Sequence, residues 1–452
     1  MSKESEHLNK NLTFVAKSSF VVLIGVILSK IFLYFYRVII ARYFGPEIYG
    51  LFTLTLAVLL IFSAIASFGI PEGILHFIPL YRGKNETEKL NNLFKKYLLI
   101  ILLSGIFFSF IFYFLSDFIS VYILNQPEIL NFLKIASFTL LILILSNFFL
   151  SILRAFEKIS AYSFIQNILQ NFGKVISLVL LIYLGMRESS TMVSFFIGTF
   201  LMFVVSSYLA IKIIKNNKKT NSKVRIEKKK EKFFSYSLPL MFTNILLVFY
   251  YWIDSFVIGY LNLGGEGAYQ VGIYNAALPI VLLFGVAQDF LLQSLYPLIT
   301  KEYGRKKIKL VKDLSKQIAK WIWLINLPLF LVMFLFPGTI INFLFGPEYL
   351  SAVIPLKILS LGGIISTFTG LLISILLMNG KSKIVFTNFI MTSLINIALD
   401  FILIQKFGLV GAGIATTIVW TLLTALLFIE VKKINQFLPL KRDMIKIFFI
   451  AI

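Results

Sequence analysis

Long apolar runs dominate this sequence and limit what it can fold into. Each run lasts about twenty residues, the length that an α-helix needs to cross the hydrocarbon core of a bilayer. The sequence lacks the segments of about ten alternating polar and apolar residues that mark an outer-membrane barrel. Hydrophobic residues make up 58% of the chain against 14% charged residues, far more than the core of a soluble protein needs. We therefore predict an all-α integral membrane protein.

The polar punctuation between the runs predicts twelve complete spans. They begin near Phe14, Tyr49, Leu93, Ile129, Ala161, Ser190, Ser235, Gly272, Ile318, Ala352, Ile384 and Leu409. A thirteenth run starts near Met444 and reaches Ile452 after too few residues to cross a bilayer. The first run is too long for the apolar part of a signal peptide and has no small-residue cleavage site, so we expect it to be retained.

The basic residues predict how the chain is oriented. A net charge of +22 would suggest a nucleic-acid partner for a soluble protein, but Lys and Arg gather in alternate loops, so we expect no nucleic acid. The N-terminal tail and the even-numbered loops hold 34 of them, and the opposite loops hold 3. The positive-inside rule then predicts a multi-pass protein of the cell membrane with a cytoplasmic N-terminus. With no Cys and two His, we expect no cofactor and no metal.

The longest basic loop divides the chain in two. The loop KIIKNNKKTNSKVRIEKKKEK carries ten cations and either contacts anionic lipids of the membrane or serves only as an orienting linker. We predict an N-terminal lobe at 1–211 with spans 1–6, a basic cytoplasmic linker at 212–232 and a C-terminal lobe at 233–431 with spans 7–12. Residues 432–452 form a further cytoplasmic segment and the start of span 13.

An internal repeat relates the two lobes. A shift of about 222 residues aligns YGLFTLTL (49–56) with VGIYNAAL (271–278), and NQPEILNFLKIAS (125–137) with FGPEYLSAVIPLKILS (345–360). Six spans per unit leave both units pointing the same way, so the duplication is parallel, and such repeats enclose a central site and rock about it. GPE also occurs twice, at 45–47 and 346–348, where Gly and Pro end one span and begin the next.

Several segments resemble a known family. They are IIARYFGPEIYGLFTL, SFGIPEGILHFIPLYRGK, YYWIDSFVIGYL and GIYNAALPI. Their order is similar to that in the polysaccharide-export and oligosaccharide flippase branch of the multidrug, oligosaccharidyl-lipid and polysaccharide (MOP) exporter superfamily. This resemblance covers essentially the whole chain. It implies a MATE-like fold with two pseudo-symmetric six-helix lobes around a central cavity, plus the start of a thirteenth helix. It also implies a polyprenyl-pyrophosphate-linked sugar as cargo.

The first lobe carries the cations that we expect to bind such a substrate. Lys30 and Arg37 lie seven residues apart on one face of the first span, with Tyr34 between them, and together suit a pyrophosphate. Alternatively, Arg37 extends to the interface and Lys30 pairs with an Asp. On the fifth span a polar stripe either binds sugar and phosphate or joins helices by hydrogen bonds. Its members are Asn167, Gln170, Asn171 and Lys174.

The second lobe carries acidic residues within its spans instead. Asp254, Asp289 and Asp400 are candidates for ion coupling or gating, by pairing with the cations of the first lobe or with a coupling cation. The alternative is that Asp289 and Asp400 form structural pairs only.

These features favour a flippase that carries a lipid-linked oligosaccharide from the inner to the outer leaflet by alternating access, for surface polysaccharide or glycoconjugate synthesis. The expected partners are the substrate, membrane lipids, a sodium or proton gradient, and a downstream polymerase or glycosyltransferase. No bond changes, so we expect a transporter, without catalytic residues, rather than an enzyme. A multidrug and cation antiporter of the same superfamily is the alternative. A membrane glycosyltransferase is disfavoured because every external loop is short, and there is no phosphate loop of a nucleotide-driven pump.

Overall fold

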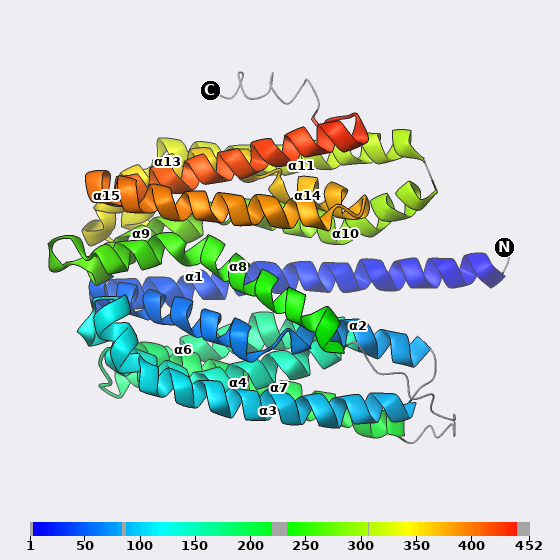
Figure 1. Cartoon of the computed structure of the whole chain (residues 1–452), viewed down its shortest axis with the longest axis horizontal. Helices are drawn as coiled ribbons and strands as arrows, with labels where there is room; N and C mark the ends of the chain where they lie inside the picture. The colour runs from blue at the N-terminus through cyan, green and yellow to red at the C-terminus, as the bar shows by residue number, and fades with distance from the viewer. Residues whose placement is uncertain (1–2, 84–86, 219–232, 306, 441–452) are drawn as a thin grey trace. The chain divides into compact units, whose positions relative to one another are not determined.

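The structure is a computed structural model that describes residues 3–83, 87–218, 233–305 and 307–440. In these residues helices are the only regular secondary structure, as expected (Figure 1). Most of the basic linker (219–232) and the predicted start of span 13 (444–452) lie outside the described residues.

The helices follow one another with short connections. In the first half of the chain they are α1 (Lys3–Ala66), α2 (Ile70–Gly83), α3 (Thr87–Phe118), η1 (Ile119–Ile123), η2 (Pro127–Ile129), α4 (Leu130–Ala155), α5 (Ile159–Ser163), η3 (Phe164–Leu169), α6 (Gln170–Tyr183) and α7 (Ser190–Lys218). In the second half they are α8 (Phe233–Leu261), η4 (Leu263–Gly265), α9 (Gly267–Val281), α10 (Phe284–Gly304), α11 (Ile308–Leu335), α12 (Pro337–Leu344), η5 (Pro347–Ala352), α13 (Val353–Ser366), α14 (Thr369–Met378) and α15 (Ser382–Asn435).

The described residues hold enough apolar helices for a multi-pass membrane protein. Nine are long and apolar enough to cross a bilayer, or ten if the bent pair of α9 and α10 forms one span. Two of them, α1 and α15, each join two helices across a kink, at Gly45 and Gly408. With α9 and α10 counted as one span, and α1 and α15 counted as two spans each, the described residues give the twelve spans expected from the sequence.

The chain forms two compact units whose limits differ from a simple cut at the basic linker. Unit 1 contains Met1–Phe44 and Leu51–Val248, and unit 2 contains Gly45–Gly50 and Phe249–Ile452. The first half of α8 belongs to unit 1 because of the contacts of Phe233. Its ring stacks on that of Tyr97 of α3, with the ring centres 3.8 Å apart, and lies against Gly73 of α2. The lobe limits set from the sequence stay a prediction.

Unit 1 is built around α4, which packs on α2, α3 and α7, while α6 packs on α7. The span formed by η2 and α4 is the most buried of the candidate spans, at 72% of its apolar window. Its residues Leu133, Ala136 and Leu140 follow the three- and four-residue spacing of one helix face, and all three are fully buried.

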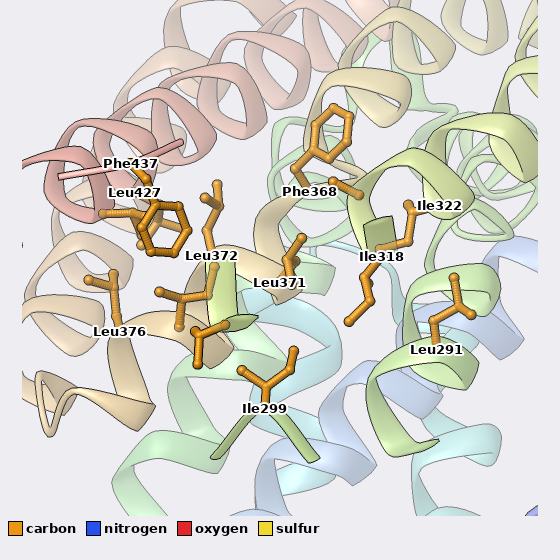
Figure 2. Close-up of a cluster of buried hydrophobic side chains, with 14 of the residues drawn as sticks. Leu291, Ile299, Ile318, Ile322, Phe368, Leu371, Leu372, Leu376, Leu427 and Phe437 are labelled. Carbon is orange, nitrogen blue, oxygen red and sulfur yellow. The ribbon is translucent and has the colours of Figure 1, made fainter. Parts of the chain in front are cut away.

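Unit 2 has its core among α10, α11, α14 and α15. Buried side chains from these helices meet in one cluster, including Ile299, Ile318, Leu372 and Leu427 (Figure 2). Helix α15 also packs along α13 and α14. The first half of α15 carries Asp400, one of the two buried acidic residues described below.

The two GPE turns adopt the same backbone conformation. Gly45 has φ 82° and ψ 177°, and Gly346 has φ 103° and ψ 176°. These positive φ angles suit glycine, and each turn ends one helix and begins the next, as the sequence predicts. Both turns belong to unit 2, where the ring of Tyr49 contacts the rings of Phe345 and Tyr349.

Matching contacts in the two units support the internal duplication. The ammonium of Lys134 lies 5.6 Å from the ring centre of Tyr113, and that of Lys357 lies 5.4 Å from the ring centre of Phe334. Three residues after each lysine, a serine donates a 2.7 Å hydrogen bond to the lysine carbonyl. These pairs are related by a shift of 221 to 223 residues, close to the repeat found in the sequence.

Candidate substrate and ion sites

In unit 1 the structure brings α1 and the fifth span together on their polar faces. The side-chain amide of Asn171 donates a 3.0 Å hydrogen bond to the hydroxyl of Ser29, the neighbour of Lys30. One turn further, the rings of Phe32 and Phe172 meet edge to face with centres 5.7 Å apart. The two sequence-predicted groups, the cations of the first span and the stripe of the fifth, therefore lie side by side.

The fifth span is interrupted by a π-helix, η3, immediately before the stripe residues of α6. Single π-turns within membrane helices open the backbone and often occur at functional sites. Here the side-chain oxygen Oε1 of Gln166 is buried and has no hydrogen-bond partner among the described residues. The amide of Asn171 also donates to the carbonyl of Asn167 at 3.0 Å, which holds it in place beside this turn.

Lys174 is the most deeply buried cation of the predicted set. Its side chain is 6% exposed, and its ammonium lies 4.3 Å from the ring centre of Phe195 on α7. Gly198 makes room for it, since a Cβ there would lie 2.5 Å from Cγ of Lys174. Among the side chains that the structure describes, no carboxylate comes within the 4.0 Å of a salt bridge to this ammonium.

A second cation faces Lys174 from α1. The positive charge of Arg37, which is half-buried, acts on Lys174 by electrostatic repulsion. Next to it, the hydroxyl of Tyr36 donates to the carbonyl of Thr191 at 2.6 Å and lies 2.9 Å from Oγ of Ser194. These bonds fix α1 against α7. An anion bound near both cations would relieve this repulsion.

The remaining predicted residues of unit 1 differ in what they face. Lys30 and Tyr34 are half-buried on α1. Gln170 points to α7, where its amide lies 3.5 Å from the hydroxyl of Thr199. Asn167 donates to the hydroxyl of Ser163 within its own span at 3.1 Å. Gln170 and Asn167 therefore make local and interhelical contacts, whereas Arg37 and Lys174 provide charge.

In unit 2 the carboxylate of Asp254 lies in a hydrogen-bonded cluster. Asp254, on α8, is 4% exposed. Its Oδ2 accepts hydrogen bonds of 2.6 Å from the hydroxyls of both Tyr274 on α9 and Thr416 on α15. Its Oδ1 accepts a 2.8 Å bond from the amide of Asn396. Three neutral donors thus surround one buried carboxylate, which compensates for its removal from water.

A second carboxylate shares one of these donors. The amide of Asn396 also donates to Oδ2 of Asp400 at 2.9 Å. Asp400 is fully buried, and its Oδ1 has no hydrogen-bond partner among the described residues. Two carboxylates this close repel when both are charged, and a bound cation or shared proton relieves the repulsion. We call Asp254, Asp400, Asn396, Tyr274 and Thr416 the acidic cluster. Its oxygen-rich composition suits a hard monovalent cation or a proton.

Asp289 is placed elsewhere. It is exposed on α10, and its charge acts on Tyr251. Of the three aspartates predicted for ion coupling or gating, the structure therefore brings together Asp254 and Asp400.

Sequence reasoning missed four contributors. Ser29 and Phe195 have no distinctive local signal. Tyr274 and Thr416 do have one, because Tyr274 belongs to the repeated GIYNAAL segment and Thr416 lies 222 residues after Ser194. The repeat shift therefore relates a hydroxyl at the cationic site of unit 1 to one in the acidic cluster of unit 2.

Comparison with known families gives two matches. The model of the family described as "Polysaccharide biosynthesis protein" matches residues 15–303, which is more than half of the chain. The model named MatE matches residues 239–402. The segments on which the resemblance was noted in the sequence lie largely within these two ranges.

Two curated proteins are similar along most of their length. An uncharacterized membrane protein, MJ1068, of Methanocaldococcus jannaschii is 25% identical over 85% of this chain and 77% of its own. A putative O-antigen transporter of Shigella flexneri is 23% identical over 84% of this chain and 88% of its own.

Solved structures share the fold. An inward-facing multidrug resistance MATE family transporter of the MOP superfamily matches with a TM-score of 0.78 at 14% identity, over 95% of this chain and 99% of that one. The lipid II flippase MurJ in an inward closed conformation matches with a TM-score of 0.68 at 20% identity, over 96% and 90%. These likenesses confirm the predicted MATE-like fold.

Proposed function

Because this chain belongs to the polysaccharide biosynthesis protein family, within the MOP superfamily, we propose that it is a flippase for a lipid-linked oligosaccharide. It is a multi-pass membrane transporter and not an enzyme. The proposed cargo is a polyprenyl-pyrophosphate-linked oligosaccharide, moved from the cytoplasmic to the external leaflet of the cell membrane. A polymerase or glycosyltransferase would then use it. The putative O-antigen transporter among the relatives supports a surface polysaccharide as the product.

The observation that carries this proposal is the environment of Lys174. A lysine that is 6% exposed, with Arg37 facing it and no described carboxylate at salt-bridge distance, holds positive charge that needs an anion. A pyrophosphate meets this need, since Arg binds phosphate oxygens with its planar fork and Lys adds a point charge. The neighbouring amides of Asn171 and Gln166 suit the hydroxyls of a sugar.

The acidic cluster supplies the coupling in this proposal. Sodium or a proton bound between Asp254 and Asp400 neutralises one of two buried charges, so occupancy changes the stability of unit 2. A gradient of that cation would then bias the alternation between inward and outward states. The 34 to 3 distribution of basic residues supports a cytoplasmic N-terminus and hence loading from the inner leaflet.

A multidrug and cation antiporter is the competing function. The acidic cluster and the MATE-like fold suit it as well. The cationic site of unit 1 favours the flippase, because a drug cation gains nothing beside Arg37 and Lys174. The two functions therefore differ in the charge of the ligand that unit 1 binds.

Binding of a fluorescent polyprenyl-pyrophosphate oligosaccharide to the purified full chain tests the proposal. We expect Lys174→Met and Arg37→Ala each to weaken binding by about 10- to 100-fold, the effect of losing one charged interaction. Lys212→Met removes an exposed cation of α7 and is the matched control. The same oligosaccharide joined to the polyprenyl chain without the pyrophosphate should bind weakly to all variants. Unchanged affinity in Lys174→Met and Arg37→Ala would remove unit 1 as the pyrophosphate site.

A further inference from the structure

A line of buried polar atoms continues from the acidic cluster along the first half of α15. Nδ2 of Asn388, Oγ of Ser393 and Oδ1 of Asp400 are all buried, and none has a hydrogen-bond partner among the described residues. From Asn388 to Asp400 the helix rises about 18 Å. Thr392 and Asn396 lie on the same face between them, at the four-residue spacing that places side chains one above another. This face is a continuous polar stripe inside unit 2.

Such atoms are costly in a membrane span. A buried polar group without a partner loses its hydration, and in proteins these groups usually bond to water or to an ion. None of these three side-chain atoms bonds to the backbone of α15. Thr392 does bond locally, donating to the carbonyls of Asn388 at 2.7 Å and Phe389 at 3.2 Å, and its oxygen remains able to accept. The stripe therefore offers a sequence of polar sites about one helical turn apart.

Helix α8 runs alongside this stripe in the same direction. The ring of Tyr250 packs on that of Phe389 with centres 5.3 Å apart, and one turn later Asp254 bonds to Asn396. The aromatic pair borders the stripe between Asn388 and the acidic cluster. The stripe thus runs beside an aromatic pair and ends at a carboxylate oxygen that has no hydrogen-bond partner among the described residues.

The other end of the stripe reaches the exposed end of α15. The helix begins at Ser382, where Lys381, Ser382 and Lys383 are exposed, and Asn388 lies less than two turns further. The basic last turn of α15, with Lys432 and Lys433, lies at the same end, because Asn379 donates a 3.2 Å hydrogen bond to Asn435. The polar stripe therefore extends from an exposed helix start to the acidic cluster.

We propose that this face of α15, from Asn388 past Ser393 to Asp400, is the path by which a monovalent cation passes between the acidic cluster and the solution on the basic side. The proposal rests on the proposed function of the acidic cluster as the cation site. Sodium and a proton, carried by water along the stripe, are the two cations that fit its neutral oxygens and amides. The path would set how fast the cation exchanges, whereas the acidic cluster sets how tightly it binds.

Kinetics separate a path residue from a ligand. Trp252 lies two residues before Asp254 and Trp420 four residues after Thr416, so tryptophan fluorescence can report cation binding. We would measure binding rates of the purified full chain after a sodium jump and, in a second arm, after a pH jump. We expect Ser393→Ala and Asn388→Leu each to slow association and dissociation together by about tenfold, the effect of one lost polar partner, with an unchanged dissociation constant.

Two controls keep the outcomes distinct. Thr387→Val changes an exposed hydroxyl on the opposite face of α15, which bonds to the carbonyl of Lys383, and should leave the rates unchanged. Asp400→Asn should abolish cation binding altogether. If Asp400→Asn abolishes binding while Ser393→Ala and Asn388→Leu exchange the cation at wild-type rates, the path is wrong and the cation site stands. If the wild-type protein binds neither cation, both proposals are overturned.

Discussion

The hydroxyl of Tyr274 donates a 2.6 Å hydrogen bond to Oδ2 of the buried Asp254. A bond to a charged acceptor contributes more to stability than a bond to a neutral one, about 1.5–3 against 0.5–1.5 kcal/mol. We therefore expect Tyr274→Phe to destabilise the protein more than Tyr36→Phe, which removes buried contacts to the neutral oxygens of Thr191 and Ser194. Thermal unfolding in detergent measures both losses. Equal losses would contradict the stronger bond expected between Tyr274 and Asp254.

The acidic cluster predicts stabilisation by a cation. A ligand that binds only the folded state adds about 2.7 kcal/mol when its concentration is 100 times its dissociation constant. We expect sodium, or a lower pH, to raise the unfolding temperature of the wild-type chain, and neither to do so in a double variant Asp254→Asn and Asp400→Asn. Asp289→Asn, which changes the exposed aspartate of α10, is the control and should respond like wild type. A response that persists in the double variant would place the cation elsewhere.

The close contact between Gly198 and Lys174 predicts that a larger residue at position 198 changes the affinity for the substrate. A methyl group at this position would collide with Cγ of Lys174 and with the backbone carbonyl oxygen of Gln170, so Gly198→Ala should push α7 away from α6 and separate the ammonium from the ring of Phe195 while keeping its charge. We expect affinity for the pyrophosphate-linked lipid to fall by about tenfold, less than in Lys174→Met. Gly285→Ala has nothing within 4 Å of the added methyl and serves as the control. An affinity that matches wild type in Gly198→Ala would mean that the position of Lys174 does not matter.

The substitution Gly50→Ala is expected to cause a large loss of stability. In unit 2, a Cβ at Gly50 would overlap the backbone carbonyl of Ala268, and one at Gly272 would overlap that of Pro46. A backbone carbonyl cannot move aside as a flexible side chain can, so the loss should reach or exceed the roughly 1–3 kcal/mol of ordinary overpacking. Thermal unfolding of Gly50→Ala against Gly285→Ala measures it. Near-equal stability would show that residues 45–50 do not need to pack so closely in unit 2.

The sequence predicted the helical class, the spans and the GPE turns because each depends on local composition. Apolar length determines a membrane helix, and Gly with Pro determines where it bends, as at Gly45 and Gly346. The start of α8 in unit 1 could not be predicted, since it depends on Phe233 stacking on Tyr97. Long-range packing of this kind has no signal in a single sequence.

The same distinction applies to the site. Charged residues within apolar runs stand out, so Arg37, Lys174, Asp254 and Asp400 were found. Asp289 stands out equally in the sequence, and only the structure shows that it is exposed on α10. The π-turn of η3 and the contact of Phe195 with Lys174 escape sequence reasoning, because one depends on a backbone distortion and the other on which helix lies opposite.

Transfer of a fluorescent polyprenyl-pyrophosphate oligosaccharide between the leaflets of proteoliposomes tests the central claim most directly. We predict transfer above that of empty liposomes, faster with a sodium or proton gradient and close to background in Lys174→Met. The Lys212→Met protein, with the exposed cation of α7 removed, should transfer like wild type. Transfer no faster than in empty liposomes, together with exchange of a cationic dye for sodium or protons, would contradict the flippase and establish the antiporter.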